Sequence, residues 1–301
     1  MHHPTTNFAK VRVAAFEGRR AAEMERLIEK HGGLPSVSPA VREVPLEENP
    51  ATVDFAHRLM TGGIDAVLFT TGAGVRYLVD QVTRHVDWQR FVDALADTQT
   101  VVRGPGPTTA LKELGITPTV RADKPYTWRE VLTAIDAELP VENLTVALQE
   151  YGEPNASLVA GLEARGADVI SLLVYEWDLP EDTQRLEENV RKLADRRIDV
   201  ALFTSAVQIA HVVKVAEALD LTDAIENALR QNTVIGSIGP TTSDALREHG
   251  LPVDFEPEST TMDELVQEIA AQCGELLRRK QHRGLRVFRP NDTPPPEPPP
   301  G

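Results

Sequence analysis

The sequence reads Val-Leu-Phe-Thr-Thr-Gly-Ala at residues 67–73, and a close copy, Ala-Leu-Phe-Thr-Ser-Ala, follows at residues 201–206. Thr70 in the first stretch and Thr204 in the second are 134 residues apart. Each stretch is a short apolar run followed at once by small and hydroxyl-bearing residues, which is typical of a buried strand that enters a turn. The two stretches therefore indicate a strand-and-turn unit that the chain uses twice.

Further matches extend this repeat along the chain. Gly-Pro-Thr-Thr at residues 106–109 recurs at residues 239–242, an offset of 133. An apolar run followed by a glycine near the start of each copy agrees with this spacing. We interpret residues 10–143 and 144–277 as two copies of one unit.

Within each copy, short apolar runs alternate with segments that carry apolar residues at helical spacing. In the first copy we expect strands at residues 11–16, 66–69 and 100–103, and helices at residues 21–31, 75–82 and 107–114. Strands that alternate with helices predict parallel sheets covered on both faces. The expected fold class is α/β, with two similar doubly wound parallel-sheet domains.

Composition limits the class of protein. Of the 301 residues 41% are hydrophobic, enough for a substantial core, and no apolar run approaches the roughly 18 residues that span a membrane. The N-terminus lacks a signal-peptide pattern, and the single cysteine, Cys273, has no partner for an internal disulfide. We therefore expect a cytoplasmic protein that does not enter a membrane.

The chain is acidic, with a formal net charge of −15. Residues 278–301 hold six Lys or Arg and two acids, so residues 1–277 hold 25 basic and 44 acidic residues, a charge of −19. A body this acidic argues against nucleic-acid binding, which requires a basic surface. An anionic ligand would instead be held by local features, such as backbone amides at helix N-termini.

Four turns lie where strands are predicted to end, which is the edge at which open α/β sheets bind ligands. Small residues let a ligand approach the backbone, and hydroxyls, amides and the helix dipole favour an anion. Alternatively, Thr and Ser only cap helices and Gly only makes the turn. Recurrence in both copies favours ligand binding, and the candidate residues are Thr70, Thr71, Gly72, Gly106, Thr108, Thr109, Thr204, Ser205, Ala206, Gly239, Thr241 and Thr242.

Other kinds of site have weaker support. Residues 104–109 match neither the P-loop nor the G-x-G-x-x-G dinucleotide pattern. The eight histidines are scattered, and Cys273 has no histidine nearby in the sequence. We therefore predict no metal site, and no classical acid–base constellation is evident.

The copies differ at one position of chemical interest. Residues 41–46 align with residues 174–179, and the second copy has Tyr175 where the first has Arg42. A tyrosine hydroxyl can position or protonate a leaving hydroxyl. Its ring can also simply pack on a strand, and the residues alone favour that packed ring.

In their order and spacing, these motifs resemble the uroporphyrinogen-III synthase family. The similarity covers about residues 10–277 and rests on Leu-Phe-Thr-Thr-Gly at 68–72, its copy at 202–206, Val-Tyr-Glu at 174–176 and Ser-Ile-Gly-Pro-Thr-Thr at 237–242.

The resemblance implies that the chain crosses twice between two domains through a two-stranded ladder that acts as a hinge. Domain one would be residues 1–41 and 180–277, domain two residues 46–174, and the hinge crossings residues 42–45 and 175–179. Composition predicts a disordered, Pro-rich tail at residues 281–301.

The resemblance also implies the reaction. Hydroxymethylbilane loses its terminal hydroxyl, ring D is inverted through a spiro intermediate, and the macrocycle closes as uroporphyrinogen III in tetrapyrrole (heme) biosynthesis. Members act as monomers without a metal or organic cofactor, and a tyrosine that aligns with Tyr175 assists departure of the hydroxyl. The implied substrate contacts add Arg19, Tyr151 and Gly152 to the four turns. Such an enzyme mainly holds its folded substrate.

Two positions depart from the family pattern. Glu-Gly-Arg-Arg at residues 17–20 replaces a Thr-Arg-Pro type turn, and the counterpart Glu-Tyr-Gly at residues 150–152 has no arginine. These departures leave open a non-catalytic tetrapyrrole-binding sensor or regulator. A nucleic-acid regulator is a third hypothesis, motivated by the basic residues 278–289 and opposed by the acidic body.

Overall fold

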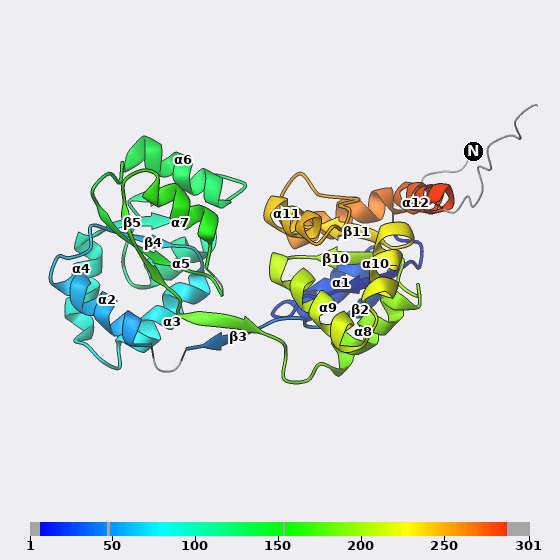
Figure 1. Cartoon of the computed structure of the whole chain (residues 1–301), viewed down its shortest axis with the longest axis horizontal. Helices are drawn as coiled ribbons and strands as arrows, with labels where there is room; N and C mark the ends of the chain where they lie inside the picture. The colour runs from blue at the N-terminus through cyan, green and yellow to red at the C-terminus, as the bar shows by residue number, and fades with distance from the viewer. Residues whose placement is uncertain (1–6, 47–48, 153, 288–301) are drawn as a thin grey trace, which may run out of the picture. The chain divides into compact units, whose positions relative to one another are not determined.

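The computed structural model describes residues 7–46, 49–152 and 154–287. The chain divides into two compact units, unit 1 with Met1–Val41 and Leu179–Gly301, and unit 2 with Arg42–Asp178. Each unit is an α/β domain built around its own parallel sheet (Figure 1).

Unit 1 contains a parallel sheet with the strand order β11-β10-β1-β2. Its strands are β1 (Arg12–Ala15), β2 (Leu34–Val37), β10 (Val200–Phe203) and β11 (Val234–Ser237). Its helices are α1 (Ala21–Lys30), α8 (Gln184–Ala194), α9 (Ala206–Ala218), α10 (Thr222–Gln231), α11 (Pro240–Glu248) and α12 (Met262–Val287).

Unit 2 contains a parallel sheet with the order β6-β5-β4-β7-β8 and an antiparallel ladder of β3 with β9. Its strands are β3 (Arg42–Pro45), β4 (Ala66–Phe69), β5 (Gln99–Val102), β6 (Val120–Arg121), β7 (Thr145–Gln149), β8 (Asp168–Leu172) and β9 (Tyr175–Asp178). Its helices are α2 (Pro50–Met60), α3 (Gly72–Val82), α4 (Trp88–Asp97), α5 (Pro105–Glu113), α6 (Trp128–Glu138) and α7 (Ala156–Glu163).

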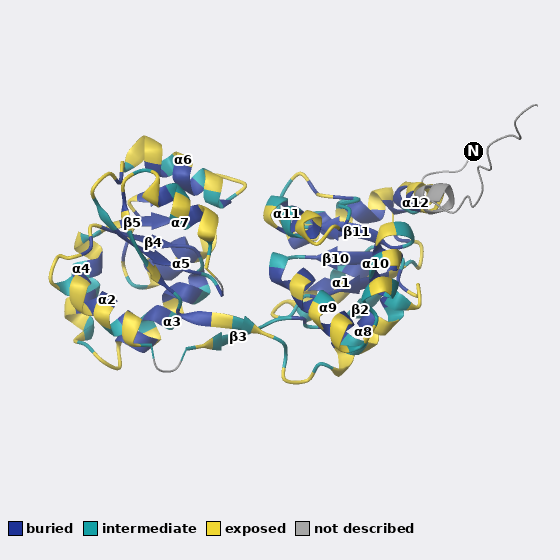
Figure 2. Ribbon diagram, viewed as in Figure 1, coloured by how far each residue is buried: buried dark blue, intermediate teal, exposed yellow. Residues whose placement is uncertain are grey.

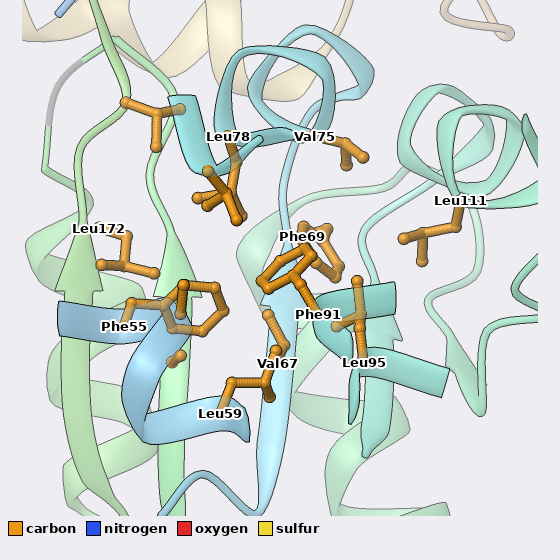
Figure 3. Close-up of a cluster of buried hydrophobic side chains, with 14 of the residues drawn as sticks. Phe55, Leu59, Val67, Phe69, Val75, Leu78, Phe91, Leu95, Leu111 and Leu172 are labelled. Carbon is orange, nitrogen blue, oxygen red and sulfur yellow. The ribbon is translucent and has the colours of Figure 1, made fainter. Parts of the chain in front are cut away.

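Alternate residues of the unit 2 strands face opposite helical layers. Val67 and Phe69 pack against α2, α3, α4 and α5 in one core cluster (Figure 3). Ala66 and Leu68 pack against α6 and α7 in another. The central strands β4, β5 and β7 are largely buried, as Figure 2 shows for β4 and β5, because helices cover each side of the sheet, whereas the edge strand β8 is partly exposed.

The unit 1 sheet is covered in the same way. Ala14 and Ala201 pack with α8, α9, α10 and α11, whereas Val13 and Val200 pack with α1 and α12. The predicted fold class, two doubly wound parallel-sheet domains with a two-stranded ladder, is confirmed.

Each sheet combines strands from both sequence copies. In unit 2, β4, β5 and β6 come from the first copy, while β7 and β8 come from the second. In unit 1, β1 and β2 come from the first copy, while β10 and β11 come from the second. The ladder follows the same repeat. At the offset of 133, Arg42 corresponds to Tyr175 and Pro45 to Asp178, so the end pairs Arg42–Asp178 and Pro45–Tyr175 are copies of one another.

The structure corrects the alignment of the two glycine-proline turns. Helix α5 begins at Pro105, not at Pro107, and α11 begins at Pro240, so Gly104 corresponds to Gly239 with an offset of 135. The sequence misled here because Gly-Pro occurs twice in residues 104–107, so either pair could be aligned. By backbone position the residue before the turn is Arg103 in the first copy and Ile238 in the second, since their amides donate to matching phenylalanine carbonyls.

The predicted start of the tail at residue 281 is wrong, because α12 continues to Val287. The Lys280 ammonium is buried on this helix and pairs with the Asp254 carboxylate, which fixes the helix against unit 1 immediately before the predicted boundary. Residues 288–301 of the predicted tail lie outside the described residues. Over the part of the chain that the structure describes, no helix has the length and apolar character needed to cross a membrane.

Candidate functional site

Each of the four turns ends a parallel strand and begins a helix. The residues at the N-caps of α3, α5, α9 and α11 are Thr71, Gly104, Ser205 and Gly239. The turns therefore lie at the carboxyl edges of the two sheets, where parallel α/β folds bind ligands.

After β4, the turn in unit 2 is held by one glutamine. The Thr70 hydroxyl donates to the Gln149 carbonyl oxygen at 2.8 Å, and Gln149 Oε1 accepts from the amides of Thr70 and Thr71, both at 3.3 Å. Thr71 Oγ1 accepts from the Gly74 amide at 3.0 Å and so caps α3. The backbone of this turn is fixed before any ligand arrives.

The turn after β5 touches the turn after β4. A Cβ atom on Gly72 would lie 2.7 Å from the Gly106 carbonyl oxygen, so a larger residue at 72 would push the two turns apart. The buried Thr108 hydroxyl donates to the Gly104 carbonyl oxygen at 2.8 Å, whereas Thr109 is exposed. Thr108 therefore serves the helix start, and Thr109 is the residue open to solvent.

Tyr175 meets this edge from the ladder strand β9. Its side chain is packed, with 1% of the residue exposed, and its ring lies 5.3 Å from the Tyr77 ring between centroids. The Tyr175 hydroxyl lies 3.3 Å from Thr71 Oγ1. Tyr77 in turn donates to Glu43 Oε2 at 3.2 Å. The packed ring that the residues alone favoured is confirmed, and the hydroxyl reaches the turn through Thr71.

Tyr151 and Gly152, at the end of β7, belong to an aromatic cluster on the same edge. The Tyr151 ring lies edge to face with Trp177 at 5.2 Å between centroids, and the Arg103 guanidinium lies 4.5 Å from the Tyr151 centroid. Gly152 has φ +73°, and a Cβ atom there would lie 2.2 Å from Trp177 Cδ2. Only glycine fits this approach without displacing the indole.

Glu150 turns inward rather than toward a ligand. Its buried carboxylate accepts from the Asn155 amide at 3.1 Å and from Ser171 Oγ at 3.2 Å. Burial raises the pKa of the Glu150 carboxyl, while the bonds from Asn155 and Ser171 act in the opposite direction. This departure from the family pattern therefore fixes the start of α7.

In unit 1, the turn after β10 uses different partners. The Thr204 amide donates to Gln208 Oε1 at 2.8 Å, and the Thr204 hydroxyl donates to Glu17 Oε2 at 2.6 Å. Glu17 Oε1 also accepts from the Arg20 amide at 3.2 Å. Ser205 forms no side-chain capping bond to α9, unlike Thr71 in the other copy. The start of α9 thus keeps more donors for a ligand.

The turn after β11 is narrow. A Cβ atom on Gly239 would lie 2.6 Å from Thr260 Cγ2. Thr242 is buried and Thr241 is exposed, and Ala206 across the edge is partly exposed. Arg19 is exposed at the end of β1, next to Arg20, which pairs with Glu23.

Neither a metal cluster nor a reactive thiol emerges from the described residues. No three His, Cys, Asp or Glu side chains within residues 7–46, 49–152 and 154–287 are grouped so as to hold a metal ion. Burial raises the pKa of Cys273 to about 12, so the thiol stays protonated at neutral pH and belongs to the core.

Three residues of the edges were missed from the sequence. Two of them, Arg103 and Gln149, are the first polar residue after an apolar run. The third, Gln208, lies within one helical turn of a predicted turn. That position relative to the strand ends was the available signal. Gln208 serves the turn that begins its own helix, whereas the amides that Gln149 serves follow the neighbouring strand β4, which is distant in the sequence.

Comparison with known proteins gives a consistent result. A family model described as uroporphyrinogen-III synthase HemD matches residues 22–267. The uncharacterized protein YjjA of Bacillus subtilis is 30% identical over 259 residues, which is 86% of this chain and 94% of that protein.

Solved structures agree with the family match. A mutant uroporphyrinogen III synthase from Thermus thermophilus superposes with a TM-score of 0.66 at 27% identity, covering 89% of this chain and 99% of the other. The uroporphyrinogen-III synthetase of Helicobacter pylori has a TM-score of 0.51 at 16% identity, with 86% and 97% covered, and supports the fold alone.

Proposed function

The chain belongs to the uroporphyrinogen-III synthase family, and from that membership we propose that it converts hydroxymethylbilane to uroporphyrinogen III. The substrate loses its terminal hydroxyl as water, ring D is inverted, and the macrocycle closes. The observation that carries the proposal is that the family match spans residues 22–267 and so includes all four carboxyl-edge turns.

The turns suit a substrate that carries many carboxylates. Amides at the starts of four helices face the edges, and the helix dipoles favour negative charge there. Because Gln149 and Gln208 already fix the backbone of the turns, little conformational entropy of the protein is lost when the substrate binds. We assign substrate contacts to the accessible residues Thr71, Thr109, Ser205 and Thr241, with Thr70, Gly72, Gly106, Thr108, Thr204, Ala206, Gly239 and Thr242 shaping the turns.

We assign Tyr175 to departure of the substrate hydroxyl, acting through Thr71. Tyr175→Phe removes the contact with Thr71 Oγ1 while the ring stays packed on Tyr77. Loss of one hydrogen bond in the transition state predicts roughly a two- to tenfold fall in kcat with little change in KM. Tyr77→Phe, which removes the neighbouring hydroxyl, is the control; equal kcat in wild type and Tyr175→Phe would remove Tyr175 from the mechanism.

The isomer of the product tests the function. Purified protein is mixed with freshly prepared hydroxymethylbilane, the products are oxidised to porphyrins, and the type I and type III isomers are separated. We expect type III in proportion to enzyme concentration. Type I alone, the product of spontaneous closure, would exclude synthase activity.

A tetrapyrrole-binding sensor is the second candidate. It is favoured by Glu17 and Glu150, whose carboxylates are both engaged inside the turns, and by the burial of Tyr175. Binding of uroporphyrin III without any turnover of hydroxymethylbilane would support the sensor over the synthase.

We also propose that the protein acts as a cytoplasmic monomer in tetrapyrrole biosynthesis. Light scattering after size-exclusion chromatography, with and without uroporphyrin III, tests the monomer. A stable dimer at working concentration would contradict it.

A further inference from the structure

The carboxyl edge of unit 2 holds an arginine that the residue motifs did not indicate. Arg103 follows β5 directly, and its amide donates to the Phe69 carbonyl oxygen at 3.0 Å, which places it beside the end of β4. The next residue, Gly104, is the N-cap of α5. Arg103 therefore lies at the same edge as the two unit 2 turns, after β4 and β5, that are assigned to substrate binding.

Its guanidinium is held against an aromatic face. The Arg103 Cζ atom lies 4.5 Å from the centroid of Tyr151, and the Tyr151 ring is itself braced by Trp177 at 5.2 Å and 75°. Trp177 is seated against Gly152, where a side chain would collide with it. Three segments of unit 2, at the ends of β5 and β7 and in β9, thus build one stack.

No acidic side chain among the described residues neutralises the charge of this guanidinium. Within the described residues, Arg103 forms no ion pair and no side-chain hydrogen bond, although the chain has 46 acidic residues. Two other arginines of unit 2 are paired with acids: Arg76 on α3 pairs with Glu113 at 2.8 Å, and Arg165, just after α7, pairs with Asp136 at 2.6 Å. A partly exposed arginine without an acid at the ligand-binding edge of an acidic protein points to an anionic ligand.

The stack presents the guanidinium in a geometry that suits a carboxylate. A guanidinium placed over an aromatic face is attracted by the ring, and this contact uses none of its N–H groups as hydrogen-bond donors to an oxygen. A carboxylate can then accept two parallel hydrogen bonds from the planar fork. Because the ring already restricts the side chain, less conformational entropy is lost on binding.

We propose that Arg103, stacked on Tyr151, is a carboxylate subsite that binds an acetate or propionate side chain of the tetrapyrrole. The assignment of the ligand class depends on the proposed function. The matching position in unit 1 is Ile238, a partly buried residue of the core, so the subsite exists in one copy only. It therefore gives the two similar edges unequal affinity for carboxylates.

Binding of uroporphyrin III, followed by fluorescence quenching at several salt concentrations, tests the subsite. Arg103→Gln is expected to raise the Kd by roughly ten- to a hundredfold, because a charge-assisted hydrogen bond to the ligand is lost. It is also expected to weaken the dependence of Kd on salt, because one ion pair has been removed. Arg103→Lys should recover only part of the affinity, since lysine cannot form the planar fork.

Arg84→Gln provides the matched control. Arg84 is an exposed arginine paired with Asp80 on α3, so the variant makes the same change in net charge away from the stack. Its Kd should stay within twofold of wild type. An Arg103→Gln variant that binds like Arg84→Gln, or that loses affinity with an unchanged salt dependence, would overturn the subsite.

The same variants separate this inference from the function. If wild type binds uroporphyrin III but forms no type III isomer, the synthase fails while a weakened Arg103→Gln variant still supports the subsite. If wild type forms the type III isomer and Arg103→Gln has the wild-type KM and Kd, the synthase stands and the subsite fails.

Discussion

The turn after β4 in unit 2 and the turn after β10 in unit 1 are copies of one another, yet different side chains hold their backbone amides. In unit 2, Gln149 from the neighbouring strand β7 accepts from the amides of Thr70 and Thr71. In unit 1, Gln208 from the helix that the turn itself begins accepts from the Thr204 amide. The satisfied amide is common to both copies, although the glutamine comes from different positions.

Two positions have changed together. Gln208 corresponds to Gly74 in the first copy, and a Cβ atom on Gly74 would lie 2.0 Å from Gln149 Nε2. The counterpart of Gln149 is Phe16, which stacks on Phe203 at 5.0 Å between centroids. A glycine therefore makes room for the glutamine of unit 2, and a phenylalanine fills the space that this glutamine leaves in unit 1. The geometry of the turn backbone is the shared feature of the two edges.

Exchanging these residues gives the largest expected effect. Gly74→Gln overpacks the turn, and Gln149→Phe leaves the Thr70 and Thr71 amides without their acceptor, so each should lower the free energy of unfolding by roughly 1–3 kcal/mol. Gly74→Gln combined with Gln149→Phe recreates the unit 1 arrangement. The double variant should lose less than the sum of the single losses by at least about 1 kcal/mol, as measured by urea unfolding.

Gly274→Ala is the control for this cycle, because a Cβ atom there would meet nothing within 4 Å. Combined with Gln149→Phe it should be additive. If the losses of unfolding free energy from Gly74→Gln and Gln149→Phe also add in the double variant, the unit 1 arrangement of side chains cannot replace that of unit 2.

An intermediate effect is expected at the glycines that follow β7 and β1. Gly152→Ala forces a residue into φ +73° and into Trp177, whereas Gly115→Ala meets a similar φ of +76° with open space around it. Gly115→Ala should cost about 1 kcal/mol of unfolding free energy, and Gly152→Ala about 1 kcal/mol more. In unit 1, the glycine that follows β1 is Gly18, where an added Cβ atom would lie 3.2 Å from the Val41 carbonyl oxygen, so Gly18→Ala requires only a small shift.

Thermal or urea unfolding measures these losses. If the loss of unfolding free energy is largest for Gly152→Ala, smaller for Gly115→Ala and smallest for Gly18→Ala, the aromatic stack makes the unit 2 edge the more tightly packed one. Equal losses for Gly152→Ala and Gly115→Ala would mean that Trp177 moves aside freely.

The smallest effect concerns Glu150. Because burial raises its pKa in the folded state, the folded protein keeps this proton to a higher pH than the unfolded chain, whose glutamates titrate near about 4.3. The stabilising contribution of the protonated carboxyl is therefore present below that value and is lost as pH rises through the raised pKa. Glu150→Gln should gain stability relative to wild type as pH rises from about 4 toward neutral. A difference that is constant over this range would contradict the raised pKa.

Most of the architecture followed from the repeated stretches in the sequence. The apolar runs at 66–69 and 201–203 predicted buried parallel strands because these strands are covered on both faces. The turn after β5 was misaligned because its two Gly-Pro pairs are locally equivalent in the sequence; the start of α5 at Pro105 and the hydrogen bond from the Arg103 amide to Phe69 distinguish them. The stack of Arg103 on Tyr151 could not be predicted, since it joins strands that are distant in the chain.

The isomer composition formed from hydroxymethylbilane tests the central claim most directly. With wild-type protein, the type III fraction of the cyclised product should rise with enzyme concentration until type I is suppressed. A product that remains type I at every enzyme concentration, from protein that still binds uroporphyrin III, would contradict the synthase and leave a binding protein in its place.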